Sequence, residues 1–171
     1  MSPQALGSAG FAVFTLWSGA TIAVVGVVTD VEGESSVIRD SGVFALVPGV
    51  DVDEGDLLQT GVDGRVQLEM EGGTLLVVGN ASELYLTDYV LREDKSVDNA
   101  AVSLVKGWLR FVAAKVSATG RYEFNTPVAS IGIRGTEGVI EANEESSSVL
   151  LEEGQIKVLK STNWVKSAPV K

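Results

Sequence analysis

The side chains with the clearest chemical potential lie close to residue 134, where Arg134 is followed by Thr136 and Glu137. Gly132 and Gly135 flank this arginine, and glycine permits backbone angles and close approaches that a side chain would block. Arg134 would therefore project its five fixed N–H donors from a stiff turn with few side chains around it. A guanidinium in this setting suits the recognition of a carboxylate.

Two interpretations of this arginine are open. In the first, Arg134 contacts a carboxylate of a ligand or partner, and the candidate binding residues are Arg134, Glu137, Thr136 and Asp56. In the second, Arg134 locks the turn by pairing with Glu137 or Asp56. We favour the second, because a half-buried arginine without a partner is costly. It predicts that Arg134→Ala lowers the melting temperature.

Carboxylates are the other abundant chemical group. The densest acidic stretch runs from Asp51 to Asp56, and oxygen ligands of this kind suit Ca²⁺. The stretch does not match an EF-hand loop, because its glycine is at the fifth position and the twelfth is not glutamate. We therefore favour a solvated turn here, as for the acidic residues at 141–145 and 152–153. No pair of carboxylates stands out as a glycosidase pair, and we predict no metal and no cofactor.

Composition excludes several classes of enzyme. The 171 residues include no cysteine and no histidine, which rules out disulfides, thiolate zinc sites and Ser–His or Cys–His nucleophile pairs. The formal net charge of −10, from 13 basic and 23 acidic residues, makes nucleic acid an unsuitable partner. Trp108, Arg110 and Phe111 could stack on bases or sugars, but core packing is the simpler explanation. We expect no catalytic residues and no enzymatic activity.

The elements that position these residues are predicted to be strands. Arg65–Met70 shows the pattern, since Val66, Leu68 and Met70 alternate with polar residues, as a half-buried strand requires. Similar short runs recur every 8–12 residues or so, which is typical of all-β folds. The expected strands are Val24–Thr29, Ser36–Arg39, Val43–Val47, Leu57–Thr60, Arg65–Met70, Thr74–Val78, Glu83–Tyr89, Ala101–Lys106, Trp108–Ala113, Arg121–Asn125, Ala129–Ile133, Val139–Glu141, Ser148–Leu151 and Gln155–Leu159.

Turn residues agree with this prediction. Asp63-Gly64 and Gly72-Gly73 are typical of two-residue hairpins, and single glycines at 107 and 154 indicate further breaks between strands. Leu75–Val78 is apolar throughout, which predicts burial on both faces. No long window has helical periodicity. The predicted fold is therefore all-β, with antiparallel hairpins curled into a β-sandwich or short solenoid-like stack.

The N-terminal segment has three interpretations, because residues 1–29 carry no charged side chain. Residues 1–23 would form a secretory leader. Residues 10–28 would form a membrane anchor of nearly sufficient length. The third interpretation is a tail followed by a buried first strand. Under the first two, residues 24–171 form a β domain outside the cytoplasm.

Several short motifs, in a fixed order, resemble the FecR domain, an all-β module of bacterial envelope proteins. They include Gly55-Asp56, residues 60–68, residues 73–79, residues 82–86, residues 106–112 and the closing run at 131–137, with Pro48-Gly49 ahead of them. The resemblance covers about residues 26–140. It implies envelope signalling or ligand sensing, and it implies no catalytic residues.

The chain also departs from the FecR regulators it resembles. Only nine residues precede the apolar segment, too few for a sigma-binding helical bundle, and only 34 follow Glu137. We therefore predict an extracytoplasmic sensing or binding module that contacts an envelope protein or glycan and is periplasmic, secreted or anchored to the inner membrane. The alternative is a structural envelope component with no ligand of its own. A binder should show an exposed apolar patch or an uncovered edge strand, which a structural component should hide or pair with itself.

Overall fold

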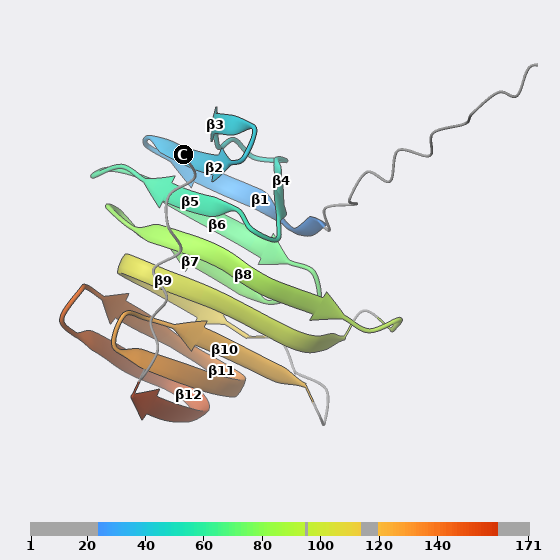
Figure 1. Ribbon diagram of the computed structural model, residues 1–171, viewed down its shortest axis with the longest axis vertical. Coiled ribbons are helices and arrows are strands. Elements are labelled where there is room, and N and C mark those ends of the chain that lie inside the picture. Colours follow the sequence, from blue (N-terminus) through green and yellow to red (C-terminus); the bar gives the residue numbers. More distant parts are fainter. Residues whose placement is uncertain (1–23, 95, 114–119, 161–171) are drawn as a thin grey trace, which may run out of the picture.

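The computed structural model describes residues 24–94, 96–113 and 120–160, and within them it contains twelve β-strands and no helix. This confirms the predicted all-β class (Figure 1). The strands are β1 Val24–Glu32, β2 Ser35–Arg39, β3 Gly42–Ala45, β4 Asp51–Asp53, β5 Leu57–Thr60, β6 Arg65–Met70, β7 Leu75–Val78, β8 Glu83–Leu91, β9 Val97–Val112, β10 Arg121–Asn125, β11 Ala129–Ala142 and β12 Ser147–Lys160.

All twelve strands belong to one sheet, which curls into two layers. The first layer has the order β3, β2, β5, β8, first half of β9, β10, and then parts of β11 and β12. The second layer has the order β4, β1, β6, β7, second half of β9, and then the remaining parts of β11 and β12. In Figure 1 the strands of both layers lie one below another, with β3 at the top and β12 at the bottom, and we call this arrangement the stack.

Glycines allow single strands to pass from one layer to the other. β9 pairs with β8 and β10 before Gly107, and with β7 and β11 after it. Gly107 has φ +91°, which favours glycine, and a Cβ there would lie 2.0 Å from Ser82 Oγ. β11 and β12 cross together, because Gly135 and Gly154 both have positive φ and lie against each other.

The core fills the space between the layers. Alternation along each strand directs one set of side chains inward, so that Val66, Leu68 and Met70 of β6 are buried as predicted. The two layers meet in an aromatic cluster, where the ring of Phe111 lies 4.7 Å from that of Phe124. Tyr122 packs on Phe124 in turn, with ring centroids 5.3 Å apart.

Several expectations about single elements are wrong. Asp63-Gly64 does not close a hairpin, because β5 and β6 lie in different layers and do not pair. A hairpin at Gly72-Gly73 between β6 and β7 is confirmed, but its loop has three residues rather than two, because Met70 lies opposite Thr74. Leu75 is exposed, so β7 is buried on one face only. β4 was not predicted, and β10 pairs with β9 in parallel, whereas the other pairs are antiparallel.

The predicted leader of residues 1–23 lies outside the described residues. Val24–Val28, which the anchor interpretation also included, begin β1, and Val25 and Val28 are buried in the core. Within the described part of the chain no helix has the length and apolar character needed to cross a membrane.

The stack of strands begins with β3 in the first layer and β4 in the second, and both layers end with β12.

Candidate functional site

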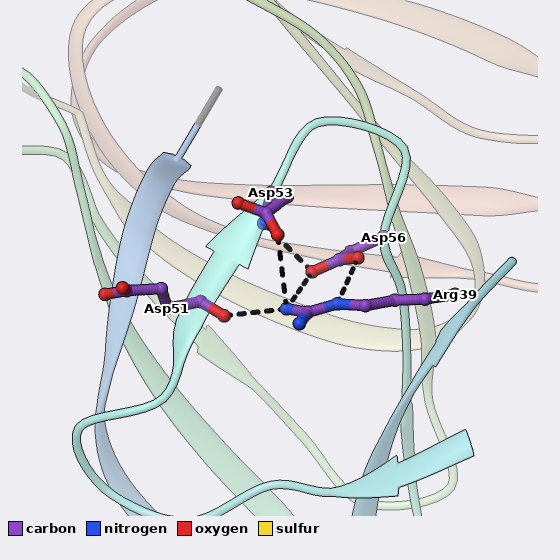
Figure 2. Close-up of polar contacts among 4 residues, drawn as sticks. All are labelled: Arg39, Asp51, Asp53 and Asp56. Atoms are coloured by element: carbon purple, nitrogen blue, oxygen red, sulfur yellow. Dashed lines mark hydrogen bonds and ion pairs between the residues drawn. The ribbon is translucent and has the colours of Figure 1, made fainter. Parts of the chain in front are cut away.

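The best-organised polar cluster is centred on Arg39, the last residue of β2. Its Nε donates to Asp56 Oδ1 at 2.8 Å, and its Nη2 donates to Asp56 Oδ2 at 2.7 Å (Figure 2). Nη2 also donates to the backbone carbonyl of Asp51 at 2.7 Å and lies 3.6 Å from the Asp53 carboxylate. The arginine thus ties β2 in the first layer to β4 in the second layer and to the turn before β5.

Burial and pairing determine the electrostatics of this cluster. Asp56 is only 3% exposed, and its Oδ2 also accepts a hydrogen bond from the Asp53 backbone N–H at 2.9 Å. The hydrogen bond from Arg39 to Asp56 raises the pKa of the arginine. Desolvation raises the pKa of Asp53, and the neighbouring Arg39 opposes that shift. A bidentate pair between a half-buried arginine and a buried carboxylate is a structural clamp.

This arrangement explains the acidic run that we considered as a calcium site. The carboxylate of Asp56 is directed at a guanidinium, and Asp51 contributes its backbone carbonyl rather than its side chain. Among the described residues, no group of three or more acidic side chains is arranged to hold a metal ion.

A second arginine, Arg110 of β9, holds the predicted site residue Glu137. Its Nη2 donates to Glu137 Oε1 of β11 and, at 3.3 Å, to Glu152 Oε2 of β12. These side chains are partly exposed, so the network contributes less than a buried pair would. It links three neighbouring strands of the second layer near the end of the stack.

Thr136 stabilises the corner where β11 and β12 change layers. Its buried hydroxyl donates to the Gln155 carbonyl at 3.0 Å and accepts from the Arg134 backbone N–H at 3.1 Å. The Arg134 side chain is exposed and makes no ion pair with the described residues. The predicted pair between Arg134 and Glu137 or Asp56 is therefore wrong, because other arginines hold both carboxylates.

The four predicted site residues do not form one site. Asp56 belongs to the clamp near β4, whereas Arg134, Thr136 and Glu137 lie in β11, at the opposite end of the stack in Figure 1. Their binding role stays a prediction. Arg39 was missed, although a signal was present: it is two residues after the inward-facing Val37 and so shares its face.

A groove lies beside the β2–β3 hairpin. It has a volume of about 580 Å³ and is lined by Gly33, Glu34, Ser35, Ser36, Val43, Phe44, Ala45, Leu46, Gln59, Thr60 and Gly61. Phe44 is 47% exposed and Val43 is more exposed still. The Ser35 hydroxyl is buried and has no hydrogen-bond partner among the described residues. Among the described strands, β3 pairs only with β2, so no described strand covers its outer edge.

Comparison with family models places the chain. Residues 56–157 match the family described as FecR protein, from the clamp aspartate into β12. This match covers well over half of the chain, which therefore belongs to the FecR family, as the ordered motifs predicted. The family is regulatory and non-enzymatic, which is consistent with a signalling-related module. Comparison with curated proteins and with solved structures gave no match.

Proposed function

We propose that this FecR-family chain is a non-enzymatic sensing or binding module of the bacterial cell envelope. It acts outside the cytoplasm, in the periplasm or secreted, or held at the inner membrane by its N-terminal segment. Its ligand is an extended segment of an envelope protein, and its binding surface is the β2–β3 end of the stack. Family membership supports the signalling role, and the open β3 edge beside the groove supports the mode of binding.

The chemistry of this end suits strand addition. An extended peptide that pairs with the free edge of β3 would gain main-chain hydrogen bonds. The exposed ring of Phe44 would receive an apolar side chain of the peptide. The groove also offers the side chain of Gln59 as a polar contact.

Differential capture from an envelope extract tests this proposal. The chain and its Phe44→Ser and Val43→Lys variants are used as baits, with Val90→Lys of β8 as the matched control at another exposed valine. We expect one protein to be captured by the chain and the control and to be lost from both hairpin variants. Equal capture by all four baits would show that the β2–β3 end is not the binding surface.

A structural envelope component is the second candidate, and one observation favours it. At the other end of the stack, the 14-residue strand β12 pairs only with β11 among the described strands, and a long edge of it is available for assembly. Retention of an envelope phenotype by the Phe44→Ser variant, with its loss in β12 variants, would favour this candidate.

A further inference from the structure

β12 ends the stack without covering its core. Four apolar residues of β12 face the space between the layers, because each lies opposite an inward-facing residue of β11. The pairs are Val149 with Ile140, Leu151 with Gly138, Ile156 with Ile133 and Val158 with Ile131. Their partners Ile140 and Ile131 are fully buried, whereas Leu151 is 38% and Val158 is 53% exposed. The core-facing side chains of β12 therefore continue the core. Beyond β12, at the end of the stack, no described residue packs against them.

The backbone of β12 is equally open. It pairs with β11 along its whole length, from Ser147 opposite Ala142 to Lys160 opposite Ala129, and no other described strand pairs with it. A long edge strand with exposed apolar side chains is a template for pairing with another chain. Folded proteins normally block such edges with charges, prolines or bulges. β12 has no proline, its charged residues are Glu152, Glu153, Lys157 and Lys160, and its pairing with β11 is irregular only near the crossing at Gly154.

Two copies of β12 can pair in an antiparallel register that is centred on the bond between Glu153 and Gly154. In that register the inward-facing apolar residues oppose one another, and the outward-facing residues do the same. The partners would be Val149 with Val158, Leu151 with Ile156, Ser148 with Leu159, Leu150 with Lys157 and Glu152 with Gln155. In a straight strand the two residues of each pair would face opposite sides of the sheet, because their numbers differ by an odd value. At the crossing near Gly154 the inward–outward alternation of β12 shifts by one residue, so the two residues face the same side.

The crossing also makes the two layers continuous. Residues 147–153 of β12 lie in the second layer and residues after Gly154 lie in the first. A two-fold axis through the crossing exchanges the layers, so each layer of one copy would extend into the opposite layer of the other. β11 and β12 already pair across a common crossing in this way, with Gly135 against Gly154.

One pair of opposite charges fits this register, while Glu152 and Glu153 of both copies lie near the two-fold axis. Lys157 of one copy would lie diagonal to Glu152 of the other on the outer face, within reach of long side chains. Symmetry produces this pair twice. Each copy would contribute 14 paired residues, and the two strands would share on the order of ten backbone hydrogen bonds. The extent of this pairing resembles that between β11 and β12.

We propose that β12 is the interface of a two-fold symmetric dimer, in which two copies of this chain join end to end through antiparallel β12–β12 pairing. The dimer completes the core at this end of each stack. It leaves both β2–β3 ends free, at the two far ends of the assembly, and so does not depend on the proposed ligand.

The oligomeric state of the purified chain tests the dimer. Sedimentation should give the mass of two chains, and Val158→Lys should weaken dimerisation by about tenfold or more, because it places a charge in the shared core. Val43→Lys, at the opposite end, should leave the dimer intact. A monomer at all concentrations, or a dimer that Val158→Lys does not weaken, would overturn the proposal.

A variant ending at Lys160 separates the dimer from self-capping by the C-terminal residues 161–171. The proposal predicts that this variant dimerises like the intact chain. If the intact chain is monomeric and the shortened variant dimerises, residues 161–171 cover β12 and the proposal is wrong.

Disulfide trapping tests the register, since the chain has no cysteine of its own. The double variant Ser148→Cys/Leu159→Cys places two thiols opposite each other in the dimer, at exposed positions. Oxidation should produce a covalent dimer. Leu150→Cys/Leu159→Cys, displaced by two residues, should cross-link much less. The reverse order of yields would contradict the register.

Discussion

At the scale of single residues, two arginines show how a guanidinium's partners determine its role. Arg39 is half-buried and holds Asp56 through two hydrogen bonds, whereas Arg134 is exposed at the corner of β11. Alternation explains the difference. Arg39 shares the inward face of β2 with Val37, and Arg134 follows the inward-facing Ile133. The glycines near Arg134 allow the corner and do not bury the arginine.

This difference predicts opposite effects on stability. Arg39→Ala should lower the free energy of unfolding by about 2–4 kcal/mol, because it leaves the buried Asp56 carboxylate without its charged partner. Arg134→Ala should change it by no more than about 0.5 kcal/mol. Urea denaturation measures both. The double variant Arg39→Met/Asp56→Asn should recover part of the loss, and an equal loss for Arg39→Ala and Arg134→Ala would contradict the clamp.

Two buried tyrosines predict a loss of stability at alkaline pH. Desolvation raises the pKa of Tyr89 and of Tyr122. The unfolded chain releases these protons near pH 10, while the folded chain keeps them, so folding is favoured below about pH 10 and progressively less above it. The free energy of unfolding should fall by about 1.4 kcal/mol per pH unit for each tyrosine.

Denaturation at a series of pH values, with and without the two hydroxyls, measures this effect. The variant Tyr89→Phe/Tyr122→Phe should be less stable at neutral pH, since Tyr89 loses its hydrogen bond to the Glu71 carbonyl. Its stability should nevertheless vary less above about pH 10. An unchanged alkaline slope in the variant would assign the loss to other groups.

At the scale of elements, the corners within long strands are the main structural device. Gly107 lets β9 serve both layers, and its space is limited by Ser82, whose Oγ accepts a hydrogen bond from the Trp108 N–H at 3.0 Å. Gly79 is packed in a similar way against the ring of Trp108. These contacts hold the connection between β7 and β8 against the corner of β9.

The corner at Gly107 should therefore tolerate no side chain. Gly107→Ala should lower the free energy of unfolding by about 2–4 kcal/mol, because it combines positive φ with overlap on Ser82. Gly132→Ala in β11 is the control, since its Cβ would meet only the Lys157 carbonyl at an ordinary 3.8 Å. Chemical denaturation should show little change or a small gain for the control. Similar values for both variants would show that the corner is not packed as described.

The sequence predicted most strands because alternation is a local property. Leu57–Thr60, Arg65–Met70 and Arg121–Asn125 have the predicted bounds. The strand prediction failed at Gly107 and Gly154, because a single glycine can mark either the end of a strand or a corner within one continuous strand. Only the pairing partners before and after Gly107 or Gly154 distinguish the two cases, and these partners are distant in sequence.

The candidate site was harder to predict for the same reason. Asp56 was identified, but its partner Arg39 lies 17 residues earlier and reaches it only because β2 pairs with β5. Glu137 was also identified, but Arg110 was assigned to packing rather than to this pair. The groove beside Phe44 had no signal in the sequence, because it depends on how β2, β3 and β5 meet.

At the scale of the whole molecule, the core is continuous and no described strand covers either end of the stack. β9 lies in the middle with partners on both sides in each layer. Within residues 24–94, 96–113 and 120–160, β3 and β12 each have a single partner strand. Local stability should therefore decrease from the centre of the stack toward its ends, where the proposed ligand and dimer contacts lie.

Native-state hydrogen exchange measures this gradient directly. Amides of β9 whose neighbours are buried, such as those of Leu104 and Leu109, should exchange only through global unfolding. Amides of β3 should exchange through local opening, at a free energy lower by several kcal/mol. β12 distinguishes the two ends, because the dimer would protect its amides in proportion to protein concentration, whereas β3 would be unaffected. Protection of β3 equal to that of β9 would contradict an open binding edge, and β12 protection independent of concentration would argue against self-association.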